Sequence, residues 1–171
     1  MEELCESIGV SRRTFFNYFA SKEDAVLGLS VRDDHTAAEE QFVHGESRGA
    51  GAGISPTLVP DLSELLIGRW ELMDLSRDDA RSLAAAFRRE PRLLSRVSEI
   101  SRTQELGDIA LVERREHLAP GDLRAAAAVQ LLGAMLRASV EASLQVGADA
   151  DEPLRNAVAR RLAAARAVFS A

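Results

Sequence analysis

The sequence predicts an all-α fold, and three observations support this prediction. Hydrophobic residues make up 46% of the chain but aromatic residues only 5%, alanine is abundant, and β-branched runs are scarce. This composition favours helix over sheet. Apolar residues recur at intervals of three and four along most of the 171 residues, the period of an amphipathic helix. Glycine and proline separate these segments, so we expect about eight helices and no strand.

The first two helices are expected to be short. Residues 1–8 carry apolar side chains on one face, and Gly9 supplies the positive φ that ends a helix. Ser11 is a good N-cap for a second helix over residues 12–18, because its hydroxyl can accept a bond from a free backbone N–H. The two helices are therefore joined by a tight turn.

A third helix is expected to begin after Ser21, which is its N-cap, and to run to about His44. Glu23 and Asp24 fall in its first turn, where carboxylates interact favourably with the helix dipole. The glycine-rich stretch 45–53 that follows is expected to be a linker. It marks a boundary between residues 1–44 and 45–171.

Helical periodicity resumes after the linker. Two prolines support the assignment, because Pro91 and Pro153 stand where a first helical residue is expected. Pro120 and Gly121 mark a turn between two long helices. The expected helices cover residues 56–73, 78–90, 91–118, 122–146 and 153–169.

Charge and cysteine content restrict the function classes. The formal net charge is −6, so the chain is no general polycation, and a nucleic-acid contact must use a local basic patch. Cys5 is the only cysteine, which excludes an intrachain disulfide and indicates a reducing compartment. No apolar stretch reaches about 18 residues, and the start lacks the pattern of a signal peptide. We therefore expect a cytoplasmic protein.

Local basic charge occurs in the second helix and the turn after it. The window from Ser11 to Lys22 holds three positive charges and no acidic residue. Small, donor-rich side chains on one helix face are what a recognition helix needs in the major groove, and positive charge beside them suits phosphate. Val10, Phe15 and Phe19 are expected to face inward. The predicted DNA contacts are Ser11, Arg12, Arg13, Thr14, Asn17, Tyr18 and Lys22.

The run from Glu3 to Asp24, ELCESIGVSRRTFFNYFASKED, resembles the TetR family of bacterial repressors. Gly-Val-Ser followed by Tyr-Phe-x-Ser-Lys-Glu at this spacing is specific to that family's helix-turn-helix. The resemblance covers about residues 1–44. It implies that 1–44 form a DNA-binding domain lacking the family's usual first helix, and that 45–171 form a ligand-binding and dimerisation domain. A dimer bound to a palindromic operator and released by a small effector is the implied activity.

The last two expected helices support dimerisation independently. In residues 122–146 the polar side chains form one narrow stripe, and a helix this apolar is expected to be buried on two sides. One side can face its own core and the other a second subunit, which gives a two-fold four-helix interface. The predicted interface residues are Leu132, Leu136, Val140, Leu144, Leu154, Val158, Leu162 and Phe169.

A pocket for a hydrophobic effector is expected in the C-terminal part. The candidate lining residues are Leu66, Trp70, Met73, Phe87 and Met135, although apolar residues at helical spacing are more often plain core. Arg69, Arg114 and His117 are alternative partners for an anionic group of the effector. Solvated charge is the simpler interpretation of these three residues.

The sequence leaves two other function classes as alternatives. A ligand-binding dimerisation module without DNA activity is the alternative function, because the first helix of the family pattern is missing. A soluble enzyme has little support, since the sequence shows no acid–base or metal-binding constellation. We therefore expect no catalytic residues, no metal and no cofactor.

Overall fold

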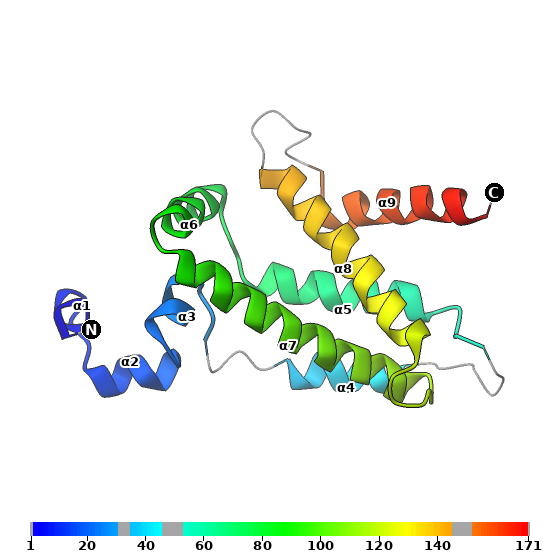
Figure 1. The fold of residues 1–171 in the computed structure, drawn as a ribbon, viewed down its shortest axis with the longest axis horizontal. Coiled ribbons are helices and arrows are strands. Elements are labelled where there is room, and N and C mark those ends of the chain that lie inside the picture. The colour runs from blue at the N-terminus through cyan, green and yellow to red at the C-terminus, as the bar shows by residue number, and fades with distance from the viewer. Residues whose placement is uncertain (1, 31–34, 46–52, 145–151, 171) are drawn as a thin grey trace. The chain divides into compact units, whose positions relative to one another are not determined.

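The computed structural model describes residues 2–30, 35–45, 53–144 and 152–170, and the described residues are all-helical with no strand (Figure 1). The prediction of an all-α fold is confirmed. The described helices are α1 (Glu2–Ser7), α2 (Arg12–Tyr18), α3 (Lys22–Val26), α4 (Thr36–His44), α5 (Leu58–Leu72), α6 (Arg77–Arg89), α7 (Pro91–Arg115), α8 (Leu123–Leu144) and α9 (Leu154–Phe169).

Packing divides the chain into two compact units, which are described separately. Unit 1 comprises Met1–His35 and Leu75–Ile100, and unit 2 comprises Thr36–Asp74 and Ser101–Ala171. Unit 1 thus holds α1 to α3, α6 and the first part of α7. Because this division follows packing alone, a functional boundary after residue 44 stays a prediction.

Glycine turns end two of the short helices of unit 1. Gly9 has a φ of 69°, its N–H bonds Glu6, and the next N–H reaches back to Cys5 at 3.0 Å. This pair of bonds is a Schellman motif, which satisfies the last carbonyls of α1. Gly28 has a φ of 71° and closes α3 by the same pattern.

The single helix expected from residue 21 to residue 44 is therefore wrong. The described chain holds α3 up to Val26 and a separate α4 from Thr36. The physical reason is Gly28, whose positive φ lets the backbone leave the helix after one and a half turns. Asp33 and Asp34, which lie between the two helices in the sequence, fall outside the described residues.

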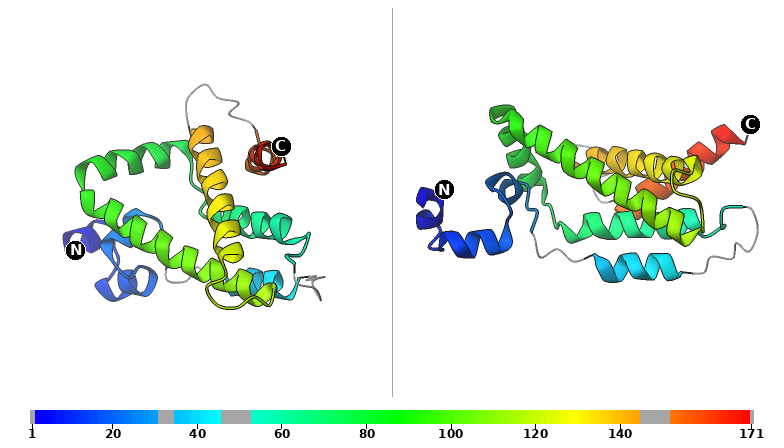
Figure 2. Two further views of the ribbon diagram at one scale, coloured as in Figure 1. Left: turned by 45° about the vertical axis from the view of Figure 1, so that its right-hand side comes forward. Right: turned by 60° about the horizontal axis from the view of Figure 1, so that its bottom comes forward.

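The core of unit 2 forms around α5. This helix packs against α4, α8 and α9, and α8 also packs against α9 (Figures 1 and 2). Leu62 and Val112 have no exposed surface. Burying an apolar side chain of this size contributes about 1.5–3 kcal/mol to stability. The buried core residues are Phe42, Leu58, Leu62, Leu65, Leu111, Val112, Ala125, Val129 and Leu132.

Helix α8 is apolar over an unusual length. By length and composition alone, Leu123–Ser143 could cross a membrane, although no span was expected from the sequence. Exposed Arg137 and Glu141 lie in this segment, and three of its residues belong to the core of unit 2. These features suit a core helix, but only 28% of the apolar window is buried within the chain. Much of the apolar surface of α8 is therefore not covered by the described residues of the chain.

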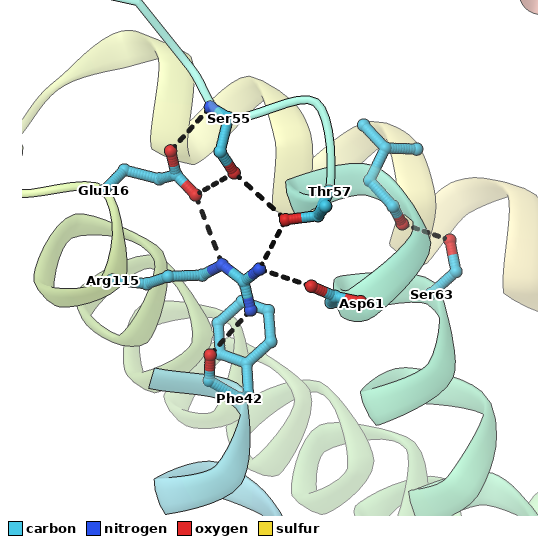
Figure 3. A network of polar contacts seen from close by, with 8 residues as sticks. Phe42, Ser55, Thr57, Asp61, Ser63, Arg115 and Glu116 are labelled. Carbon is cyan, nitrogen blue, oxygen red and sulfur yellow. Dashed lines mark hydrogen bonds and ion pairs between the residues drawn. The ribbon is translucent and has the colours of Figure 1, made fainter. Parts of the chain in front are cut away.

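A buried arginine joins three segments of unit 2 (Figure 3). The Arg115 guanidinium donates to the Phe42 carbonyl at 2.6 Å, to the Thr57 hydroxyl at 2.9 Å and to the Asp61 carboxylate. It also lies 4.7 Å from the centroid of the Phe42 ring, a cation–π contact. The end of α7 is thereby tied to α4 and to the start of α5.

The neighbouring carboxylate completes this network. Glu116 accepts from the Ser55 backbone N–H at 2.7 Å and from the Ser55 hydroxyl at 2.8 Å, and it lies 3.2 Å from the Arg115 Nε. Both charged side chains are almost fully buried. Buried charges persist only where they are paired and hydrogen-bonded, as they are here.

Arg69 corrects a second expectation from the sequence. Its side chain is 91% buried rather than solvated, and it bonds Asp108 and, at 2.7 Å, Glu39. Its Nε is buried without a hydrogen-bond partner. Burial raises the pKa of Asp108, although the bond from Arg69 opposes this effect. Arg114 and His117 are exposed.

Candidate nucleic-acid interface

Local side-chain bonds define the start of α2. The Ser11 Oγ accepts from the Thr14 backbone N–H at 3.0 Å and lies 2.8 Å from the Thr14 hydroxyl. The Ser11 φ and ψ are extended, as an N-cap requires. The cap predicted from the sequence is confirmed. The cap lies two residues after Gly9 and α2 begins at Arg12, so α2 follows α1 through a tight turn.

One face of α2 packs inward. Phe15 is 5% exposed and its ring lies 5.5 Å from those of Phe16 and Phe19, in edge-on and tilted geometries. Val10 and Phe19, which were expected to face inward with Phe15, are half-buried. Cys5 is buried on the neighbouring α1. These contacts fix which side of α2 faces solvent.

The opposite face of α2 and the turn after it are exposed. All seven residues predicted to contact DNA have exposed side chains. The Arg12 guanidinium lies 3.0 Å from the Glu2 carboxylate, and the Lys22 Nζ lies 3.7 Å from the Glu23 carboxylate. Surface ion pairs of this kind contribute at most about 1 kcal/mol, so a phosphate group can replace the carboxylate. Their contact with DNA stays a prediction.

A partly buried ion pair holds the start of α3 against α7. The Asp24 carboxylate receives the Arg96 Nε at 2.7 Å and the Arg96 Nη2 at 3.1 Å, a bidentate pair, while the Ser21 Oγ caps the helix at the Asp24 N–H. The bonds from Arg96 lower the pKa of Asp24. Sequence reasoning assigned Asp24 only a helix-dipole role, because its partner is 72 residues away.

An open groove of about 640 Å³ lies between the same elements of unit 1. The turn from α2 to α3 forms one wall, and the first turns of α7 form the other. The first wall carries two carboxylates, and the α7 wall carries two arginines and one carboxylate. The lining residues are Ala20, Ser21, Glu23, Asp24, Arg92, Ser95, Arg96 and Glu99.

The five residues predicted to line an effector pocket are not brought together by any described cavity. Leu66 and Met135 pack at the edge of the unit 2 core, Trp70 is half-buried, and Met73 is 41% exposed. Phe87 belongs to unit 1. Neither the groove above nor a smaller cavity of about 190 Å³ between α8 and α9 includes any of the five.

The residues predicted to form a dimer interface occupy different environments. Leu132, Val140 and Val158 are already buried within the chain, so they are core contacts of the single subunit. Phe169, by contrast, is 77% exposed. The side chain of Leu144 lies outside the described part of the chain, and Leu136, Leu154 and Leu162 are half-buried.

Sequence reasoning missed other exposed apolar residues on the same helices. Leu123 is 82% exposed and Leu131 48% exposed on α8, and Val168 is 73% exposed at the end of α9. Their helical spacing alone does not separate them from core leucines. Only the packing of α8 on α5 shows which side of the helix remains open.

Among the described residues, no group of three His, Cys, Asp or Glu side chains is placed to hold a metal ion. Comparison of the chain with protein-family models, curated proteins and solved structures gave no match. The functional assignment therefore depends on the residues and their geometry.

Proposed function

We propose that this chain is a TetR-like transcriptional repressor that binds a palindromic DNA operator as a homodimer. In this proposal residues 1–44 form the DNA-binding domain, with α1 and α2 as its helix-turn-helix, and residues 45–171 form the ligand-binding and dimerisation domain. The alternative, a dimerisation module without DNA activity, uses the same C-terminal helices.

One observation carries the proposal. The side chains of α2 divide into a buried aromatic residue and an exposed face that bears hydroxyl, amide and guanidinium donors. Arg12 and Arg13 are exposed next to the N-cap of α2, where a recognition helix contacts bases and phosphates. Ser11 and Thr14 also form the N-cap of α2, but substituting the exposed Arg12, Arg13 or Asn17 should change stability little.

The exposed apolar side of α8 and the end of α9 support a dimer. Two copies of the chain that cover these surfaces would bury Leu131 and Phe169 against their symmetry mates. A two-fold axis would then relate two recognition helices, which explains why the operator would be palindromic. This dimer is the arrangement that the sequence resemblance implies.

Release by a hydrophobic effector follows from the same scheme. An effector that binds one spacing of the two recognition helices better than the other shifts the population away from the DNA-binding state. The shift can be no larger than the difference in effector affinity between the two states.

The test is selection of genomic DNA fragments by the purified protein. The proposal expects enrichment of a palindrome by the wild type and its loss in an R12A/R13A variant. The matched control is R102A/R114A, which removes two exposed arginines of unit 2 and should enrich the same palindrome. Enrichment of no fragment by a folded dimer would favour the alternative function.

A further inference from the structure

Three exposed arginines lie where α6 ends and α7 begins. Arg88 and Arg89 occupy the last turn of α6, and Arg92 the first turn of α7, with Glu90 as the one acidic residue between them. None of the three arginines forms an ion pair with another described residue. This is a local excess of positive charge in a chain whose formal net charge is −6.

Helix electrostatics explain only part of this arrangement. Cations in the last turn of a helix interact favourably with its dipole, which accounts for Arg88 and Arg89. The same effect is unfavourable for Arg92, which is in a first turn that holds no acidic residue. A role in folding therefore leaves the position of Arg92 unexplained.

Arg92 also lies beside the predicted DNA-binding segment, within the same unit. It lines the groove whose other wall includes Ala20 and Ser21, the residues that follow α2. Arg96, four residues further along the same face of α7, bonds Asp24 directly. The start of α7 thus lines the same groove as the turn after α2, and the pair between Arg96 and Asp24 joins the two segments.

Each acidic residue of the groove lies beside a cation. Arg96 bonds Asp24 at 2.7 Å and Glu99 at 2.9 Å, and Lys22 lies 3.7 Å from Glu23. The lining itself holds three carboxylates and two arginines, so the excess of positive charge lies in the run from Arg88 to Arg92, where Glu90 is the one carboxylate beside three arginines. Arg92 is the arginine of the lining that forms no ion pair with another described residue. An exposed hydroxyl, that of Ser95, stands one helical turn away as a further donor.

We propose that Arg88, Arg89 and Arg92 form a second phosphate-binding surface, which holds the DNA backbone beside the stretch read by α2. This inference rests on the proposed function. A guanidinium group presents paired donors that match phosphate oxygens, and such contacts add affinity without sequence preference. The surface would therefore strengthen operator and non-specific DNA binding about equally.

The experiment compares salt dependence. Fluorescence anisotropy would follow binding of a labelled duplex by the wild type, by R88A/R89A/R92A and by the control R81A/R102A/R114A, between 50 and 200 mM salt. The slope of log K against log salt changes by roughly 0.9 per phosphate contact. Loss of three contacts means that wild-type affinity falls about 40-fold more than that of the test variant over this range.

The expected result is a reduced slope for the test variant on operator and random duplexes alike, with the control unchanged. Thermal melting checks that each variant remains folded, which the exposure of these arginines predicts. A test variant whose slope equals that of the control would overturn the inference. If R12A/R13A then still loses the palindrome, the proposed function stands without this surface. A wild type that binds no duplex would refute both.

Discussion

The buried Arg115 network gives the sharpest stability prediction for this chain. Substituting Arg115 with alanine removes its bonds to Phe42, Thr57 and Asp61 and leaves Glu116 without its cation. Removing one partner of a buried ion pair costs about 3–5 kcal/mol, because the remaining charge is uncompensated. A chain of this size should lose roughly 2–4 °C of Tm per kcal/mol, so we expect a Tm lowered by about 6–20 °C.

The adjacent arginine is a matched control. Arg114 is exposed and has no ion-pair partner among the described residues, so R114A should change stability by no more than about 0.5 kcal/mol. Urea unfolding followed by circular dichroism measures both variants. A double variant, R115M/E116Q, removes the uncompensated charge and should recover part of the loss. If the free energies of unfolding of R115A and R114A differ by less than about 1 kcal/mol, the buried network does not stabilise unit 2 as inferred here.

Four further predictions concern pH dependence (two of them), the recognition face and the dimer. The bonds from Arg96 lower the pKa of Asp24, so the Asp24–Arg96 pair stabilises the fold above pH 3.8, the ordinary pKa of an aspartate, and this stabilisation is lost as pH falls. The Tm difference between wild type and D24N should therefore shrink from pH 7 to pH 3. The pKa of Asp108 is raised by burial, so wild type should instead gain stability relative to D108N as pH falls toward 3.8. E2Q removes the carboxylate that pairs with Arg12, so an anisotropy titration should show DNA affinity raised a few-fold, about 0.5 kcal/mol. Weaker binding by E2Q would argue against Arg12 as a DNA contact. V168D/F169D should shift sedimentation from dimer to monomer, and an unchanged dimer would place the interface elsewhere.

Local signals made part of the structure predictable. The positive φ at Gly9 and the N-caps at Ser11 and Ser21 depend on residues within a few positions, so their geometry follows from the sequence. The buried Phe15 follows from helical spacing in the same way. Gly28 does not stand out in the sequence, because the apolar spacing of the predicted helix continues beyond it, although its backbone conformation ends α3.

Long-range partners were not predictable. Arg69 and Asp108 are 39 residues apart, and Arg115 lies 73 residues from the carbonyl it binds. A single sequence shows that a residue is charged but not which distant carboxylate or carbonyl will meet it. The same reason limits the effector pocket and the dimer interface, because spacing does not distinguish a core leucine such as Leu132 from an exposed one such as Leu131.

The most direct test of α2 as a recognition helix is equilibrium binding of a duplex by the whole protein and by its α2 variant. A labelled duplex carrying the selected palindrome would be titrated with wild type, R12A/R13A and R102A/R114A at two salt concentrations. We predict salt-sensitive binding by the wild type and the control, and a loss of at least about tenfold, equivalent to 1.4 kcal/mol, in R12A/R13A. Equal affinity of R12A/R13A and wild type for that duplex would contradict the assignment of α2 as the recognition helix.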